Sequence, residues 1–179
     1  MFFLKRDLQR YRGRFSDPTI PYIIVYRFGA WANNCCWGLR QLLLLVYFPF
    51  YRILSLLCGI EIPRQVKIGP GLRIYHFGCI VLNAEVVAGT NLTLRHGVTI
   101  GNRKNDHDVP VLGDNVDIGA GAKILGAIHI GSNVQIGANA VVLTDVPDNC
   151  IAVGVPAIVK HKKSVDFQQK DSAKCCWKD

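Results

Sequence analysis

The hydrophobic positions between Leu112 and Pro147 recur every six residues, in consecutive hexads that read LGDNVD, IGAGAK, ILGAIH, IGSNVQ, IGANAV and VLTDVP. An aliphatic residue opens each hexad, and a second small or aliphatic residue stands four positions later. This period does not suit a helix, and one long alternating strand would not need Gly or another small residue so often after the aliphatic one. We therefore predict short strands joined by tight corners, stacked as the coils of a β-helix solenoid.

The same frame extends back to Ile62 with two interruptions. The step from Ile74 to Leu82 is eight residues, so two extra residues must be accommodated around 76–78. Residues 102–109 (NRKNDHDV) keep the length of the frame but are polar at its inward positions, which predicts a loop that leaves the wall. About fourteen hexads at roughly three per coil predict four to five coils around one core. Because loops carry the polar groups of a repeat protein, we expect function at these two interruptions.

The first 60 residues follow a different pattern, with two apolar segments at 20–37 and 42–60 that predict helices. The second has only ten consecutive apolar residues before Arg52 and contains Pro49, so we expect it to be too short for a membrane span, which needs about 20. An Arg near the middle of a span would also cost roughly 2.5–3.5 kcal/mol. We expect both helices to cover the open first coil and to lie against a membrane surface, with Arg27, Arg40 and Arg52 reaching toward head groups or solvent.

The composition, 50% hydrophobic over 179 residues, predicts one compact domain with an appendage. The net charge of +8 is concentrated in residues 1–60, which hold eight Lys or Arg and two Asp. Because these charges alternate with long apolar stretches, they favour a membrane surface over nucleic acid as the partner. The seven Cys show no disulfide or CxxC spacing, and residues 1–18 are too charged for a secretory signal. We expect a cytoplasmic protein in peripheral contact with the inner membrane.

Four stretches carry a family resemblance: IEIPRQVKIGPGLRIYHFGCIV, RHGVTIGNR, the hexads IGAGAKILG and the closing VPDNCIAVGVPA. With them, residues 60–163 resemble the serine acetyltransferase-like branch of the hexapeptide-repeat acyltransferases. The apolar N-terminus followed by GIEI is also similar to the shorter members of that branch in capsule and exopolysaccharide loci, the colanic-acid locus among them. The resemblance implies a left-handed parallel β-helix, a homotrimer, and acetyl-CoA as co-substrate bound between subunits. We expect no metal. We expect three parts: a helical N-terminal segment (1–60), the β-helix (61–163) and a polar tail (164–179).

The resemblance also implies a catalytic pair. In serine acetyltransferases a His deprotonates the acceptor hydroxyl, and an acidic residue fifteen positions earlier orients it; these positions hold His76 and Glu61 here. An alcohol is a weak nucleophile near neutral pH, and a neutral imidazole can take its proton as the oxygen attacks a thioester. The alternatives are a corner histidine bonded only to a neighbouring coil and a solvated wall glutamate.

Further candidates flank this pair, and the alternative for each is an ordinary surface or corner residue. We expect three of them to contact the acceptor, namely Tyr75, His96 and His107. Two small residues match positions where the CoA arm of the family lies against the wall, and two lysines after GVPA are candidates for the CoA phosphates. These cofactor-binding candidates are Ala120, Ala138, Lys160 and Lys163.

The expected acceptor follows from positions at which this sequence differs from the serine acetyltransferases. Those enzymes carry an Asp before the catalytic His and an Arg-His pair at the end of the loop that corresponds to residues 102–109. Here Tyr75 and Asp108-Val109 stand in those places, so most charges for an amino acid are missing. We expect an O-acetyltransferase acting on a hydroxyl of a capsular or exopolysaccharide sugar, free or lipid-linked. The alternatives are a serine O-acetyltransferase of cysteine biosynthesis and a non-catalytic membrane-associated scaffold. A zinc carbonic anhydrase would need three converging His with a short-spaced pair, which the five His do not show.

Overall fold

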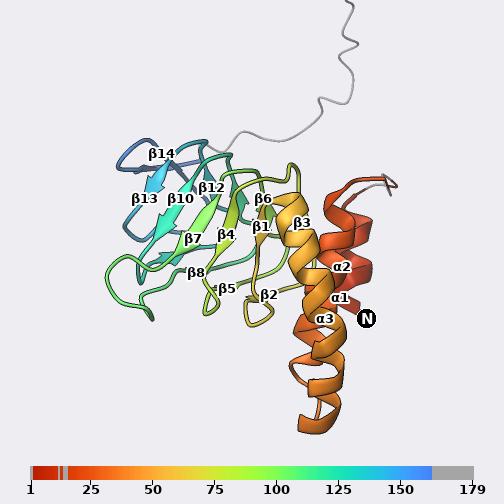
Figure 1. The fold of residues 1–179 in the computed structure, drawn as a ribbon. Helices are drawn as coiled ribbons and strands as arrows, with labels where there is room; N and C mark the ends of the chain where they lie inside the picture. Colours follow the sequence, from red (N-terminus) through yellow and green to blue (C-terminus); the bar gives the residue numbers. More distant parts are fainter. Residues whose placement is uncertain (1, 12, 14–15, 163–179) are drawn as a thin grey trace, which may run out of the picture.

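The computed structural model describes all residues except 1, 12, 14–15 and 163–179. Three helices come first: α1 (Phe2–Gln9), α2 (Thr19–Ala32) and α3 (Trp37–Cys58). Short strands then wind into a solenoid beside the helices (Figure 1). Their bounds are β1 (Ile60–Glu61), β2 (Lys67–Ile68), β3 (Arg73–Ile74), β4 (Ile80–Leu82), β5 (Val87–Ala88), β6 (Thr93–Leu94), β7 (Thr99–Gly101), β8 (Val111–Leu112), β9 (Asp117–Ile118), β10 (Lys123–Leu125), β11 (His129–Ile130), β12 (Gln135–Ile136), β13 (Val141–Val142), β14 (Cys150–Val153) and β15 (Ile158–His161).

The strands form three sheets, because each one pairs in parallel with the strand one coil further along the chain. Sheet A contains β1, β4, β7, β10 and β13, and sheet B contains β2, β5, β8 and β11. Sheet C contains β3, β6, β9, β12 and β14, and β15 closes it in antiparallel orientation. The five strands of sheet A mark five turns of the solenoid, so the predicted stack of coils is confirmed.

The inward positions of the hexads form one apolar column. The six residues that open the hexads, from Leu112 to Val142, are at most 3% exposed, and the second inward set, from Val116 to Val146, is at most 9% exposed. Small side chains occupy the column at Ala122 and Ala140, which lets neighbouring Ile side chains fill the space between coils. The solenoid is therefore held together by coil-to-coil burial of aliphatic side chains.

The strand register locates both interruptions of the repeat. Val81 pairs with Thr99, an offset of 18 residues, whereas Lys67 pairs with Val87 at an offset of 20 and Thr99 with Lys123 at an offset of 24. The two extra residues of the first coil fall between β3 and β4, at the corner from sheet C to sheet A. The six extra residues of the third coil fall between β7 and β8, at the corner from sheet A to sheet B.

The corner between sheets B and C is built from a ladder of asparagines. Asn91, Asn115, Asn133 and Asn149 all have positive φ, between 56° and 59°, which Asn tolerates better than most residues. Each of the first three donates a side-chain hydrogen bond to the Asn of the next coil, at 2.8–3.1 Å. The recurring TN, DN and SN pairs of the sequence therefore set this corner of every coil.

Side chains from α1, α2 and the turn between them cover the open edge of the first coil. The Tyr22 hydroxyl accepts a hydrogen bond from the Ile62 N–H, and the Tyr26 hydroxyl donates to the Val66 carbonyl. Asp7 accepts from the Gly71 and Leu72 N–H groups, and Tyr11 from that of Ile74. The backbone groups that would otherwise form an unpaired sheet edge are thus bonded to the helical segment.

Arg27 does not reach toward a surface, so that prediction is wrong. Its side chain is 8% exposed and forms an ion pair with the buried Asp7, with Nε 2.7 Å from Oδ2. It also donates to the carbonyls of Ile68 and Gly69. The sequence pattern could not show this, because the partner carboxylate lies 20 residues earlier and the carbonyls belong to the solenoid.

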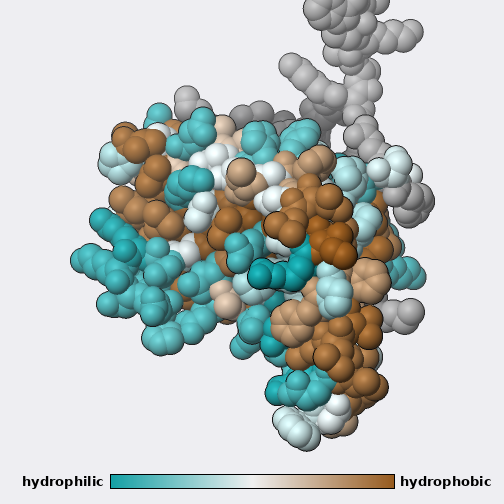
Figure 2. All heavy atoms as spheres, viewed as in Figure 1, coloured by the Kyte–Doolittle hydropathy of each residue, from teal (hydrophilic) through white to brown (hydrophobic). Residues whose placement is uncertain are grey.

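The helix α3 is longer than the apolar segment predicted from the sequence. It begins at Trp37, continues through Pro49 and ends at Cys58, and the next residue, Gly59, takes a left-handed conformation with φ of 60°. The helix has 22 residues, and its most apolar window has a mean hydropathy of 1.7. It is therefore long and apolar enough to cross a membrane by length and composition alone, so the length argument against a span is wrong. Only 17% of its apolar window is buried, and Figure 2 shows apolar surface continuing along the part of the helix that projects past the solenoid, up to a more polar tip.

Candidate active site

Four of the predicted site residues lie along one corner of the solenoid, where sheet C turns into sheet A. His76 follows β3, His96 follows β6, Ala120 follows β9 and Ala138 follows β12. Backbone hydrogen bonds join successive turns of this corner, from Gly97 to Gly78, from Gly121 to His96 and from Asn139 to Ala120, at 2.8–2.9 Å. The corner therefore offers a row of small residues that leads to two histidines.

The bulge at this corner brings His76 to the surface. Gly78 has φ of 113° and Cys79 of 52°, so the chain makes two left-handed turns that a normal six-residue corner does not need. The Gly78 carbonyl accepts from Gly97, and the Gly59 carbonyl accepts from Ile80, which fixes both sides of the bulge. His76 is exposed at its tip.

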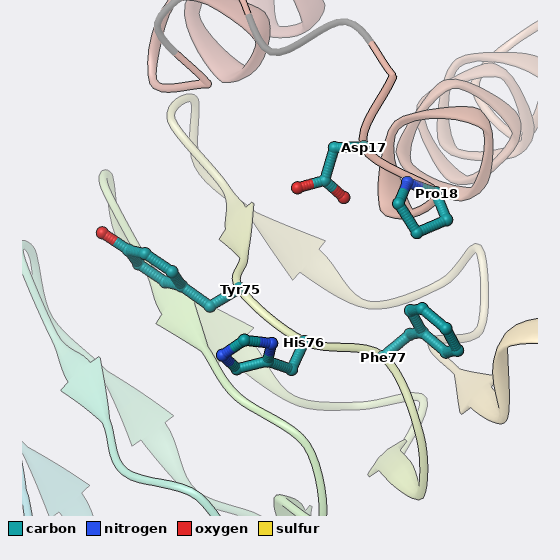
Figure 3. A pocket seen from close by; sticks show the side chains of 5 residues that line it. All are labelled: Asp17, Pro18, Tyr75, His76 and Phe77. Carbon is teal, nitrogen blue, oxygen red and sulfur yellow. The ribbon is translucent and has the colours of Figure 1, made fainter.

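A pocket of about 420 Å³ lies at the bulge, between the solenoid and the turn that precedes α2. Tyr75, His76 and Phe77 line one side, and Asp17 and Pro18 line the other (Figure 3). Figure 3 shows the Asp17 carboxylate pointing toward the bulge. Its Oδ1 accepts hydrogen bonds from the backbone N–H and hydroxyl of Thr19, so the start of α2 holds this carboxylate beside the pocket.

Asp17 is the lining residue that sequence reasoning missed. The Ser-Asp-Pro sequence before an apolar segment is a helix-start signal, and that is the only information it carries locally. Its place beside His76 results from docking of α2 on the first coil, which no spacing in the sequence shows.

The two histidines of the corner are in ring contact. The centroids of the His76 and His96 rings are 5.8 Å apart, in an edge-to-face arrangement with an interplanar angle of 67°. Glu61, the predicted orienting residue, is exposed on β1, and its register partner is Val81 of β4, just beyond the bulge. Among the described residues, no hydrogen bond joins Glu61 to His76, so the role of Glu61 stays a prediction.

Tyr75 connects the pocket to the outer face of sheet C. It is 40% exposed, and its ring stacks under the Arg73 guanidinium, whose Cζ is 3.9 Å from the ring centroid. Arg95 lies over the same ring at 5.3 Å and forms an ion pair with Asp117. Two guanidinium groups therefore hold the orientation of Tyr75 at the edge of the pocket.

His107 is not at this corner of the same chain. It lies in the loop between sheets A and B, 84% exposed, with Nδ1 2.8 Å from Glu85 Oε1. Lys160 is exposed on β15, beyond the last full coil, and Lys163 lies outside the described residues. In the part of the chain that the structure describes, no three His, Cys, Asp or Glu side chains gather where they could hold a metal ion.

The five-turn parallel solenoid defines a class of fold, the parallel β-helices, and the comparisons place the chain in one family of transferases within that class. Residues 110–144 match the family described as bacterial transferase hexapeptide (six repeats). A protein of Escherichia coli K12 named as a colanic acid biosynthesis acetyltransferase, WcaB, is 47% identical over 112 residues, which are 62% of this chain and 69% of that protein.

Two solved structures are similar over most of the chain. A serine acetyltransferase from Brucella abortus superposes with a TM-score of 0.76 and 30% identity, over 89% of this chain and 68% of that one. A serine acetyltransferase in complex with CoA superposes with a TM-score of 0.72 and 31% identity, over 89% and 68% of the two chains.

The chain therefore belongs to the hexapeptide-repeat acyltransferase family, and it is an acetyltransferase. The predicted fold class, a left-handed parallel β-helix with a short helical N-terminal segment, is confirmed by these structures together with the sheet topology.

Proposed function

We propose that the protein transfers the acetyl group of acetyl-CoA to a hydroxyl of a capsular or exopolysaccharide sugar. The observation that carries this proposal is the exposed His76 in a pocket of about 420 Å³, at the head of a corner lined by small residues. The relative named for colanic acid biosynthesis supports the saccharide, and the solved relative with bound CoA supports the donor.

The reaction that this arrangement supports is a direct transfer. His76 accepts the proton of the acceptor hydroxyl while the hydroxyl oxygen bonds to the carbonyl carbon of the thioester. The resulting tetrahedral intermediate collapses, the carbon–sulfur bond breaks, and the thiolate of CoA takes the proton from the imidazolium. The edge contact of His96 holds the His76 ring in place, and Glu61 is the candidate for stabilising the imidazolium.

Serine O-acetylation is the second candidate, because serine acetyltransferases are as well represented among the similar proteins. One feature of the site favours it: the Asp17 carboxylate beside His76 could bind the ammonium group of an amino acid. Against it stands Tyr75, a neutral aromatic residue directly before the histidine, which suits the face of a sugar ring.

The test offers the purified chain acetyl-CoA together with a panel of capsular oligosaccharides or with L-serine. The rate of acetyl transfer is measured from the CoA thiol that is released. We expect His76→Ala to lower kcat by roughly 10²–10⁴-fold. His129→Ala is the matched control, since His129 is exposed on β11 of sheet B, away from the corner, and we expect it to keep full activity. Faster turnover of L-serine than of any saccharide would overturn the acceptor. An unchanged rate in His76→Ala would overturn the mechanism, and no transfer by the wild-type chain would favour a scaffold.

We also propose that the protein works as a homotrimer on the cytoplasmic side of the inner membrane, with α3 lying on the lipid surface. The trimer is supported by the position of His107, which can reach a pocket like that of His76 only from another copy of the chain. Membrane contact is supported by the exposed apolar side chains of α3. The largest exposed fractions are those of Leu56 at 85%, Trp37 at 75%, and Leu45 and Leu57 at 72% each. The helix contains no acidic residue, and Arg40 and Arg52 give it a positive charge suited to anionic lipids.

A further inference from the structure

Three guanidinium groups gather on the outer face of sheet C, directly beside the pocket. Arg73 lies on β3, Arg95 follows β6, and Arg10 follows α1. Arg73 and Arg95 both lie over the ring of Tyr75, which itself lines the pocket. Arg10 donates to the hydroxyl of Thr93 at 2.9 Å, and Thr93 is the register partner of Arg73. These three residues are called the arginine cluster below.

The positive charge of the arginine cluster is not balanced within the described residues. Arg95 forms an ion pair with Asp117, but no carboxylate pairs with Arg10 or Arg73 in this part of the chain. Arg10 donates to the carbonyls of Gly71 and Leu92 instead. Burial and, after it, the charge of Arg73 lower the pKa of Arg10. The charge of Asp117 acts on Arg10 in the opposite direction, but this one carboxylate does not balance three guanidinium groups, and a bound anion would relieve the remaining repulsion.

Arg73 is the member with hydrogen-bonding capacity left. It lies over the rings of Tyr75 and Tyr11, at 3.9 and 5.7 Å, and its Nε is buried without a hydrogen-bond partner among the described residues. Stacking on two rings fixes the plane of the guanidinium and leaves its N–H groups free. A planar guanidinium held in this way matches the paired oxygens of a carboxylate or phosphate.

We propose that the arginine cluster is a subsite for an anionic group of the acceptor, a carboxylate or a phosphate, bound by Arg73 while the reacting hydroxyl lies at His76. This inference rests on the proposed function and narrows its acceptor to acidic saccharides or phosphorylated ones. The stacked ring of Tyr75 lies between the two points, where the sugar ring that carries both groups can rest on it.

The first experiment compares the wild-type chain with Arg73→Gln in steady-state acetyl transfer to three acceptors: a disaccharide containing a uronic acid, a sugar phosphate and a neutral disaccharide. We expect the KM of the anionic acceptors to rise about 10- to 100-fold, as for loss of a charge-assisted hydrogen-bond pair. The kcat and the KM of acetyl-CoA should stay unchanged. The KM of the neutral disaccharide should rise much less than that of the anionic acceptors, because for this acceptor Arg73→Gln removes only the support of the Tyr75 ring. Whichever anionic acceptor responds distinguishes a carboxylate from a phosphate.

Two further variants separate binding from structure. Arg73→Lys keeps the charge but loses the planar fork, so its KM should fall between those of the wild type and Arg73→Gln. Lys67→Gln is the matched control, because Lys67 is exposed at the equivalent hexad position of β2, on sheet B, and it should leave every KM unchanged.

Several results would overturn the proposal. In Arg73→Gln, an equal rise in the KM of neutral and anionic acceptors would overturn it. A rise in the KM of acetyl-CoA alone would also overturn it, because the cluster would then bind the CoA phosphates. A smaller oligomer in Arg73→Gln, with unchanged KM, would mean that the cluster pairs with a carboxylate of another copy.

A binding measurement keeps this inference separate from the proposed function. Calorimetric titration of the His76→Ala chain with glucuronate and with inorganic phosphate requires no turnover, and we expect binding of at least one of them to be lost in His76→Ala/Arg73→Gln. If binding is retained in the double variant, the subsite is wrong even where saccharide transfer is real. If L-serine proves to be the only acceptor and its KM depends on Arg73, the subsite stands and the saccharide is wrong.

Discussion

Asp7 shows how much a single buried carboxylate can hold together. It is fully buried, it forms an ion pair with Arg27, and it accepts hydrogen bonds from two backbone N–H groups of the first coil. A buried ion pair gains little over an apolar pair of similar shape, but removal of one partner leaves the other charged and unpaired. Asp7 therefore joins α1, α2 and the solenoid at one point.

We predict that Asp7→Ala destabilises the protein by about 3–5 kcal/mol, because Arg27 would remain buried without its counterion and two N–H groups would lose their acceptor. Urea unfolding followed by circular dichroism measures the change. Lys5→Ala is the control, since Lys5 is exposed on the same helix and should alter stability by less than about 0.5 kcal/mol. A stability of Asp7→Ala close to that of the wild type would contradict this account of the cap.

The candidate residues fall into two groups by how they could be found. The sequence indicates His76, because this residue stands where the six-residue repeat gains two residues and because its surroundings resemble a known motif. The sequence does not indicate Asp17 or Arg73, since neither interrupts a pattern: Asp17 precedes the start of α2, and Arg73 is an outward residue of β3. Their proximity to His76 depends on how α2 docks and how β3 leads into the bulge.

At the scale of elements, α3 combines one packed face with a wide apolar surface. Tyr47 packs against Gly29 of α2, where a Cβ would collide with its ring, and Tyr47 stacks on Tyr51 at 5.2 Å. The end of the helix leads directly into β1 through Gly59, and Ser55 donates to the Ile60 carbonyl. These attachments favour a helix that lies along a lipid surface together with α2 over one that crosses the bilayer alone.

We predict that the chain sediments with vesicles containing an anionic phospholipid and that Leu45→Asp/Leu56→Asp abolishes this binding. Both side chains are more than 70% exposed, so the substitutions should leave the fold intact while placing two charges in the lipid contact. Gln41→Asp is the matched control on an exposed polar position of α3 and should retain at least half of the binding. Cosedimentation of the double variant with vesicles at the wild-type level would exclude α3 as the contact. A wild-type chain that stays in the supernatant and dimerises through α3 would show that a second copy covers this surface.

The whole molecule places its candidate residues at different corners of one solenoid. His76, His96, Ala120 and Ala138 share the corner between sheets C and A, whereas His107 and its partner Glu85 lie at the corner between sheets A and B. A role for His107 in acceptor binding therefore requires a neighbouring copy, with the loop of one chain reaching the bulge of the next. In a closed ring of three chains each loop can meet one bulge.

This arrangement predicts complementation between two inactive variants. His76→Ala and His107→Ala should each transfer acetyl groups at least ten times more slowly than the wild type. Mixed oligomers from co-expression should regain activity, because some of their sites combine an intact bulge from one chain with an intact loop from another. Equal amounts of separately purified variants that do not exchange subunits are the control. Full activity of His107→Ala alone would contradict the shared site. So would a lack of recovery in mixed oligomers that sedimentation equilibrium shows to have three times the mass of one chain.

The sequence by itself determined the solenoid, its inward column and the two interruptions, because each of these follows from the spacing of neighbouring hexads. Only the tertiary structure decided that Arg27 is buried on Asp7, that α3 is one continuous helix, that Asp17 faces His76 and that His107 lies at another corner. Those contacts join positions far apart in the chain. They depend on how the helices dock on the solenoid and on which corner each residue occupies once the strands have paired across coils, and neither leaves a local periodic signal.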